Sequence, residues 1–309
     1  MIVGLITHPA CLDHDPGPQH PERPDRLRRV LQALEQPGFA ALLRDLAPQA
    51  TREQLALAHP PEYIDAILAI SPALGERIAL DADTVMSAGS REAALRAAGG
   101  AVMAVDAVMQ GRAERVFVAA RPPGHHAERA RPMGFCLFAN AAIAARHAQQ
   151  RWGLGRVAVV DFDVHHGNGT QDIFQADPTL FYASSHHDPC YPGTGAAGER
   201  GVGNIVNAPL PPGTGSAGFR AAWERLILPE LARFGPELLI VSAGFDAHKA
   251  DPLAQLRLEV ADFAWLTGRL TAVAKQHCQG RLVSLLEGGY DLDALAESAA
   301  AHVAALMEE

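Results

Sequence analysis

Four consecutive apolar residues at 157–160 run directly into a segment that holds two aspartates and two histidines: Asp161, Asp163, His165 and His166. So short an apolar run is typical of a buried strand of a parallel sheet rather than of a helix. Residues two apart in an extended segment point to the same side, so Asp163 and His165 share a direction, with Asp161 one step deeper. A carboxylate and an imidazole held this way suit a divalent metal such as zinc. The alternative is an aspartate that caps the next helix and histidines in ordinary polar contacts.

Strand-like and helix-like segments alternate through most of the chain. We expect strands at 2–7, 115–119, 156–160, 179–184, 238–242 and 281–286. Helical spacing predicts short helices at 51–58 and 61–70, one that begins near Pro24, and longer ones at 91–110, 136–150, 167–175, 216–233, 259–277 and 293–307. This order is typical of an α/β fold with a central, mostly parallel sheet and helices on both faces. No internal repeat or linker divides the chain, so residues 1–309 are expected to form one domain.

Chemically reactive side chains follow four of these strands. The segments are Arg121-Pro-Pro-Gly-His125-His126, Asp161 to His166, Gly244-Phe-Asp246-Ala-His248 and Glu287-Gly-Gly-Tyr290. In open parallel sheets, binding sites form beyond the carboxyl ends of the strands. The four segments therefore predict one shared site at that edge.

The residue types at this edge suit metal-assisted hydrolysis. A catalytic zinc usually has three protein ligands, and Asp246 is the best candidate for the third, although it could instead cap whatever follows. His125 and His126 suit the acid and base that move protons to and from a hydrolysed substrate. Tyr290 offers a phenolic O–H to the oxyanion of a tetrahedral intermediate, the alternative being an aromatic residue that packs at the rim.

The net charge of −9 argues against a nucleic-acid partner, because no lysine or arginine run is present to neutralise phosphates. Four cysteines without a C-x-x-C pair favour a reducing, cytoplasmic setting. No signal peptide is recognisable, and no apolar stretch reaches the ~18 residues of a membrane span. Acidic residues interrupt a basic segment near the N-terminus, so we expect a solvated helix face there; its arginines are Arg23, Arg26, Arg28 and Arg29.

Taken together, the motifs resemble those of the histone deacetylase family, which has an arginase-like α/β fold. They run in order from His20-Pro-Glu-Arg-Pro-Asp-Arg-Leu27 through Arg121-Pro-Pro-Gly-His125-His126-Ala, Gly134-Phe135-Cys136, Asp161-Phe-Asp163-Val-His165-His-Gly-Asn168-Gly-Thr, Tyr191-Pro-Gly-Thr-Gly and Ala243-Gly-Phe-Asp246-Ala to Glu287-Gly-Gly-Tyr290. The resemblance covers nearly the whole chain.

The resemblance implies a role for each of these residues. Zinc would be bound by Asp163, His165 and Asp246. His125 and His126 would be the paired acid and base, and Tyr290 would polarise the substrate carbonyl. The walls of an acyl-lysine tunnel would come from Gly134, Phe135 and Tyr191. Asp161 would accept a hydrogen bond from His125 and help hold a structural potassium ion with Ser184 and the backbone of His165.

Two positions depart from the best-known members of the family. Asn168 stands where class I enzymes have an aspartate beside the second histidine, which places the chain nearer to class II. Because a carboxylate favours the imidazolium form, a neutral amide should leave the pKa of His126 lower. Leu253 stands where one polyamine-selective branch has an acidic gatekeeper, so that selectivity is not expected. Asp81 and Asp83 still offer acidic contacts at the entrance, Asp83 in particular to a substrate backbone.

The expected activity is zinc-dependent removal of an acetyl or other acyl group from an amine, most of all from the lysine side chain or a small acylated amine. One alternative is a ureohydrolase with two manganese ions, for which His248 and Asp251 are the only nearby candidates for extra ligands. Another is an inactive protein that binds acyl-lysine. The loop 186–204 could line a contact between copies of the chain, so a homo-oligomer stays open.

Overall fold

An eight-stranded sheet forms the centre of the computed structural model, which describes residues 1–308. The spatial order of the strands is β2-β1-β5-β10-β9-β6-β7-β8, and all neighbours are parallel. Their bounds are Val3–Thr7 (β1), Leu43–Leu46 (β2), Arg115–Val118 (β5), Val157–Asp161 (β6), Leu180–His187 (β7), Ile205–Leu210 (β8), Leu238–Ala243 (β9) and Leu282–Leu286 (β10). A separate antiparallel hairpin pairs β3 (Arg77–Ala79) with β4 (Val85–Ser87).

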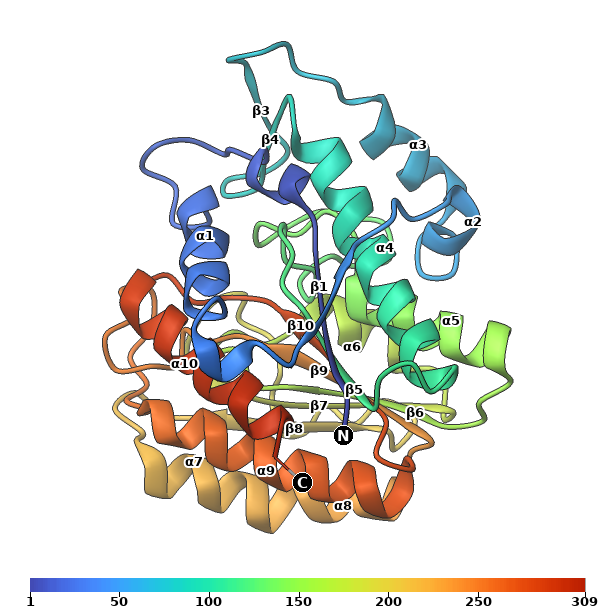
Figure 1. Cartoon of the computed structure of the whole chain (residues 1–309), viewed down its shortest axis with the longest axis vertical. Coiled ribbons are helices and arrows are strands. Elements are labelled where there is room, and N and C mark those ends of the chain that lie inside the picture. Colours follow the sequence, from blue (N-terminus) through green and yellow to red (C-terminus); the bar gives the residue numbers. More distant parts are fainter. Residues whose placement is uncertain (309) are drawn as a thin grey trace.

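Helices cover both faces of the sheet (Figure 1). One layer contains α4 (Ser90–Met109), α5 (Asn140–Trp152) and α6 (Asn168–Phe174), with the short helices α2 (Arg52–Leu55) and α3 (Pro61–Ala69) beside it. The other contains α1 (Pro24–Ala33), α7 (Ser216–Ala222), α8 (Leu228–Phe234), α9 (Val260–His277) and α10 (Leu292–Leu306). The predicted α/β architecture is thus confirmed.

The four strands that precede the reactive segments are consecutive neighbours, β5, β10, β9 and β6, in the middle of the sheet. All their residues are buried, as expected for apolar strands covered on both faces. Because they are parallel, their carboxyl ends lie at one edge. The sheet order therefore brings the four segments together there.

Several elements differ from the predicted ones. The edge strands β2 and β8 were not predicted: β2 reads Leu-Arg-Asp-Leu and is mostly exposed, and β8 contains Pro209, which a strand tolerates at a sheet edge. The β3–β4 hairpin was not predicted either. Helix α5 begins four residues later than predicted, and a π-helical turn, Trp223–Ile227, separates α7 from α8.

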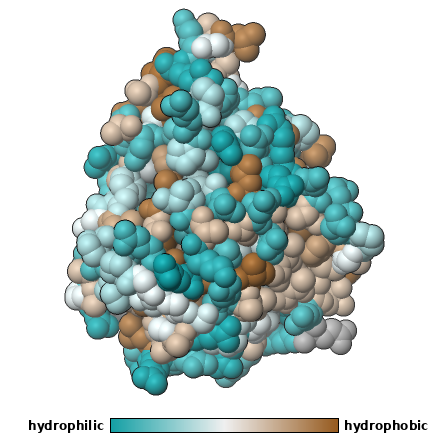
Figure 2. Space-filling view, turned by 90° about the vertical axis from the view of Figure 1, so that its left-hand side faces the viewer, coloured by the Kyte–Doolittle hydropathy of each residue, from teal (hydrophilic) through white to brown (hydrophobic). Residues whose placement is uncertain are grey.

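The β3–β4 hairpin and the loop before it project from the top of the molecule (Figure 1). Leu74 in that loop is 96% exposed and Ile78 in β3 is 41% exposed. The space-filling view shows apolar atoms at the top of the molecule (Figure 2). Within residues 1–308, none of the helices combines the length and the apolar character needed to cross a membrane.

A buried histidine of the core should make stability fall in acid. His302 on α10 is 0% exposed and bonds Thr267 Oγ1 (2.6 Å) and Ser284 Oγ (2.8 Å), and burial lowers its pKa from 6.5 to about 3. The unfolded chain binds this proton below pH 6.5 and the folded protein does not, so stability is lost as the pH falls from 6.5 toward 3. His302→Gln cannot take up this proton. Between pH 7.5 and 5, the free energy of unfolding measured with urea should fall by about 2 kcal/mol more in the parent than in the variant. An equal fall in the two proteins would contradict this.

Candidate active site

Two carboxylates and one imidazole converge at the carboxyl ends of β6 and β9. Asp163 and His165 follow β6, and Asp246 follows the neighbouring strand β9. Their ligand atoms all lie within 4.8 Å of one another, and the three side chains are buried. Backbone donors orient the carboxylates: Gly288 N donates to Asp163 Oδ2 (2.8 Å), and Val164 N to Asp246 Oδ1 (2.8 Å). The structure thus assembles the three predicted ligands, and no helix begins at Asp246 for it to cap.

The surroundings of this group fit a cation. Added Cβ atoms at Gly244 and Gly288 would collide with the carboxylates, Gly244 with Asp163 and Gly288 with both aspartates, so only glycine leaves them room. Asp246 Oδ2 is buried without a hydrogen-bond partner, although His165 Nδ1 lies 3.2 Å away. A buried carboxylate oxygen is costly unless a donor or a cation compensates it. Two oxygens and one nitrogen form a donor set that zinc accepts, with room left for substrate.

The pKa shifts of the three side chains also indicate that positive charge is favoured at this site. Burial, followed by repulsion from Asp163, raises the pKa of Asp246 to about 7. Burial would likewise raise the pKa of Asp163, but His125 and His165 outweigh it and lower the pKa. Burial would lower the pKa of His165, but its contacts with Asp163 and Asp246 raise it well above 6.5. The two carboxylates thus favour positive charge at this point, which a bound metal ion would supply.

The adjacent histidines face the same site in different protonation states. His125 Nδ1 contacts Asp161 Oδ2 at 3.0 Å, as the resemblance implied, and the ring centroids of His125 and His126 are 4.0 Å apart. Burial would lower the pKa of His125, but Asp163 and Asp161 outweigh it and raise the pKa to about 10. Burial, followed by the charges of His125 and His165, lowers the pKa of His126 well below 6.5. His125 is therefore the charged member of the pair and His126 the neutral one.

Asn168 determines which nitrogen of His126 carries the proton. The amide nitrogen of Asn168 donates to Glu128 Oε1 (2.7 Å) and to the sulfur of Met133 (3.3 Å), which turns the amide oxygen toward His126 Nδ1, 2.8 Å away. An amide oxygen only accepts, so Nδ1 must donate and Nε2 of the neutral ring keeps its lone pair. The pKa of His126 is low because of burial and the nearby charges of His125 and His165, whereas the hydrogen bond to Asn168 by itself raises it. The expected difference from an aspartate neighbour stays a prediction.

A cavity of about 340 Å³ opens onto this group. The cavity is lined by all five predicted substrate-contacting residues, the catalytic candidates His126 and Tyr290, the ligand candidate His165, and one residue that the sequence did not suggest, Cys190. The lining is Asp83, His126, Gly134, Phe135, His165, Cys190, Tyr191, Leu253 and Tyr290. Tyr191 packs edge-on against the ring of His126 at 5.1 Å, and Phe135 against that of Tyr290 at 5.9 Å. At the entrance, Tyr191 and Leu253 are 37% and 38% exposed.

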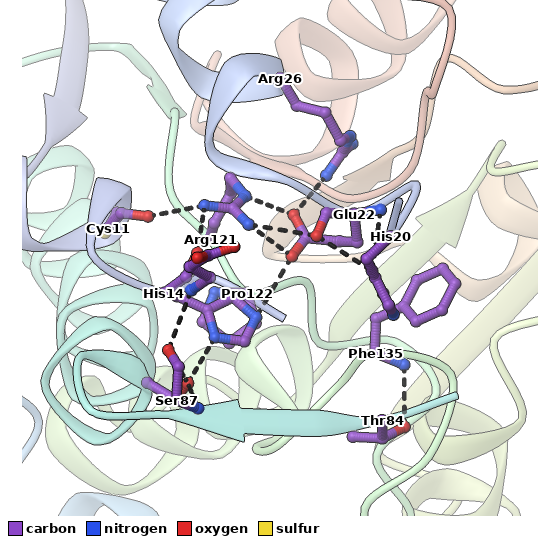
Figure 3. Close-up of polar contacts among 12 residues, drawn as sticks. Cys11, His14, His20, Glu22, Arg26, Thr84, Ser87, Arg121, Pro122 and Phe135 are labelled. Carbon is purple, nitrogen blue, oxygen red and sulfur yellow. Dashed lines mark hydrogen bonds and ion pairs between the residues drawn. The ribbon is translucent and has the colours of Figure 1, made fainter. Parts of the chain in front are cut away.

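The wall at Phe135 is held in an unusual backbone conformation. Phe135 has φ +68° and Gly134 has φ +57°, the left-handed region that a bulky side chain disfavours. Asp83 Oδ1 accepts from Gly134 N (3.1 Å), Thr84 Oγ1 accepts from Phe135 N (3.1 Å), and the His20 ring packs edge-on against Phe135 (Figure 3). The Asp83 carboxylate thus supports the wall besides facing the cavity. Sequence reasoning missed Thr84 because its partner lies 51 residues away.

A buried ion cluster lies behind the site, and it overturns the expected solvated helix face at Arg26. The Arg26 and Glu22 side chains are 0% exposed and pair at 2.9 Å, and Glu22 also pairs with buried Arg121 (Figure 3). Arg26 further donates to Gly289 O and Glu287 O (2.5 Å each), and its guanidinium lies 4.8 Å from the centroid of the Tyr290 ring. The burial of Tyr290 raises its pKa well above 10, so the phenol keeps its proton. Arg23, Arg28 and Arg29 remain partly exposed on α1 as predicted.

The ligands expected of a ureohydrolase are not assembled. His248 Nδ1 accepts from Ala250 N, and Asp251 accepts backbone N–H groups of Leu253 and Tyr290. Among residues 1–308, the group close enough to hold a metal contains only Asp163, His165 and Asp246. The second metal site is thus not supported by the geometry.

Comparisons with known proteins agree with the fold. The family profile described as "Histone deacetylase domain" matches residues 20–306. The histone deacetylase-like amidohydrolase of Pseudomonas aeruginosa is 42% identical over 295 residues, covering 94% of this chain and 76% of that protein. The polyamine deacetylase HDAC10 of Homo sapiens is 40% identical over 302 residues, covering 93% of this chain and 44% of that protein. The crystal structure of the HDA15 HD domain superposes with a TM-score of 0.91 at 36% identity, covering 98% of this chain and 88% of that one. The chain belongs to the histone deacetylase family.

Proposed function

We propose that the protein is a zinc-dependent hydrolase that removes acetyl groups from N-acylated amines, with acetyl-lysine side chains as the preferred class. Family membership identifies it as a hydrolase of the deacetylase and amidohydrolase type. The observation that carries the finer proposal is the single cavity lined by the ligand His165, the neutral base candidate His126 and the phenol of Tyr290.

Each residue has a role in this proposal. Zinc, held by Asp163, His165 and Asp246, would act as a Lewis acid on the substrate carbonyl and lower the pKa of water to about 7. His126 Nε2 takes the proton of the attacking water, and the Tyr290 O–H donates to the developing oxyanion. The proton on His126 then passes to the amine nitrogen as the C–N bond breaks, which yields acetate and the free amine.

The form of the cavity supports a long aliphatic side chain as substrate. Phe135 and Tyr191 line it with aromatic surface, which suits the methylene groups of lysine. Leu253 at the entrance gives no partner to the second ammonium of a polyamine. Acetylated polyamines and other small acylated amines stay as the alternative, because one relative is by name a polyamine deacetylase.

A structural potassium ion is part of the proposal. Asp161 and Ser184 are register partners on β6 and β7, and both are 0% exposed. Carboxylate, hydroxyl and backbone oxygens are the donors that such a hard cation takes.

A substrate panel tests the proposal. The zinc-loaded protein is given acetyl-lysine peptides, longer acyl-lysine peptides and acetylated polyamines, and acetate or free amine is measured. The proposal expects turnover of acetyl-lysine peptides above that of polyamines. Release of urea from a guanidino compound by the manganese-loaded protein, or peptide binding without turnover, would reject it.

Tyr290→Phe should lower kcat on an acetyl-lysine peptide by about 10²–10³-fold, the usual effect of removing one oxyanion donor. The measurement is steady-state acetate release at saturating substrate. Tyr63→Phe is the matched control, because its O–H donates to Leu137 O (2.6 Å) in the core rather than facing the cavity. Undiminished turnover in Tyr290→Phe would remove the phenol from the mechanism.

A further inference from the structure

Asp251 is a buried carboxylate that contacts the segment carrying Tyr290 without lining the cavity itself. It is 7% exposed and lies on the loop between β9 and α9. Oδ2 accepts from Tyr290 N at 2.7 Å and from Asp291 N at 3.4 Å, and Oδ1 accepts from Leu253 N at 3.0 Å. All of these partners are backbone groups. The carboxylate therefore controls backbone position on two loops.

Two charged side chains hold one peptide group, one at its carbonyl oxygen and the other at its N–H. The Gly289 carbonyl and the Tyr290 N–H belong to the same peptide unit. Arg26 Nε donates to that carbonyl at 2.5 Å, and Asp251 accepts from that N–H. Positive charge thus faces the oxygen and negative charge faces the hydrogen, so both hydrogen bonds are strengthened by charge. The peptide plane that precedes Tyr290 is therefore held between Arg26 on α1 and Asp251 on the loop between β9 and α9.

The local sequence explains why such support matters. Tyr290 follows Gly288 and Gly289, and Gly289 has φ +123°, so no side chain of this segment restricts rotation of the backbone. Rotation of the peptide plane redirects the Cα–Cβ bond of Tyr290, and the phenol oxygen at the far end of the ring moves most. An oxyanion donor must stay within hydrogen-bond distance of the reacting oxygen, and displacement by about 1 Å can cost 10²-fold in rate.

We propose that Asp251 is a positioning residue for Tyr290: together with Arg26 it fixes the Gly289–Tyr290 peptide plane, and through Leu253 it ties this plane to the cavity entrance. The inference rests on the proposed function, in which Tyr290 donates to the oxyanion. Asp251 acts through Tyr290 and does not contact the substrate.

A double-mutant cycle on the zinc-loaded enzyme tests this, with an acetyl-lysine peptide as substrate. Asp251→Ala should lower kcat by about 10²-fold with a smaller change in KM. Asp251→Asn keeps one acceptor oxygen and the size of the side chain, so it should lower kcat by a smaller factor. In a Tyr290→Phe background, either change should lower kcat by no more than about twofold, as expected for residues that act as one unit. Asp293→Asn is the control, because that side chain is 78% exposed.

Fluorine NMR supplies a readout that needs no turnover. The chain has four tyrosines, so 3-fluorotyrosine labelling gives a simple spectrum in which Tyr290→Phe identifies one resonance. Asp251→Asn should shift or broaden that resonance and leave that of Tyr63 unchanged.

Three outcomes would overturn the inference: unchanged kcat in Asp251→Ala, equal losses in both backgrounds, or an unaltered Tyr290 resonance. Failure of the proposed function looks different, as a parent that releases no acetate or a Tyr290→Phe variant that keeps its turnover. The fluorine spectrum still tests the positioning of Tyr290 in those cases.

Discussion

Asp246→Ala is expected to lose the bound metal and to lower kcat/KM by at least about 10³-fold, because a metal ion supplies several kcal/mol of transition-state stabilisation. Asp246 provides one of the three donors that converge within residues 1–308, and its Oδ2 has no hydrogen-bond partner there. The remaining pair, Asp163 and His165, would hold a cation much more weakly. Zinc content by mass spectrometry and acetate release from an acetyl-lysine peptide measure the two losses. In the parent, a chelator should abolish turnover and added zinc should restore it.

The control for this prediction is Asp65→Ala, which removes a carboxylate on α3 that is 61% exposed and pairs with Arg52. It should keep both the metal and the activity. An Asp246→Ala variant that retains stoichiometric zinc would reject the proposed ligand set. A variant that loses zinc but keeps its turnover would reject the role of the metal instead.

The central strands of the sheet were predictable because they can be recognised from their apolar sequences alone. β6 and β10 are short apolar runs, and burial on both faces of a parallel sheet demands such runs. The edge strand β2 is mostly exposed and contains Arg44 and Asp45, so its sequence resembles a loop, and its backbone pairing with β1 defines it. The other edge strand, β8, is almost fully buried, but Asn207 and Pro209 interrupt its apolar sequence.

The reactive residues were predictable for the same reason: they follow strongly apolar strands that are consecutive in the sheet. The supporting residues were not. Thr84 holds Phe135, and Asp251 holds Tyr290, through backbone N–H groups distant in the chain. Every residue type except proline has a backbone N–H, so the sequence does not reveal which residue the side chain will contact. Cys190 was missed because a single cysteine carries no pattern.

Arg26 and Glu22 show where charge patterning misleads. In the sequence, they belong to a mixed run of acidic and basic residues that is typical of a solvated helix. In the structure, the helix places one side of that run against the sheet edge, where Glu22 meets Arg26 and Arg121, all 0% exposed. Periodicity alone does not distinguish a buried arginine from an exposed one on the next turn.

Glu22→Ala should destabilise the fold by about 3–5 kcal/mol, the usual cost of removing one partner from a buried ion pair. The change leaves the guanidinium groups of Arg26 and Arg121 buried without their shared carboxylate. Burial would raise the pKa of Glu22, but Arg121 and His14 outweigh it and hold the pKa well below 4.5, so the carboxylate is charged at neutral pH. Thermal unfolding should shift down by on the order of 10 °C. Calorimetry or circular dichroism at neutral pH measures the shift.

The exposed residue Glu224 on the helical segment 223–227 supplies the matched control, and Glu224→Ala should stay within about 0.5 kcal/mol of the parent. Equal unfolding temperatures for the two variants would show that water compensates the two arginines. The loss in Glu22→Ala should also reach the active site. Arg121 begins the segment that carries His125 and His126, and Arg26 holds the segment that carries Tyr290. Because Glu22 pairs with both arginines, it joins the two halves of the catalytic apparatus.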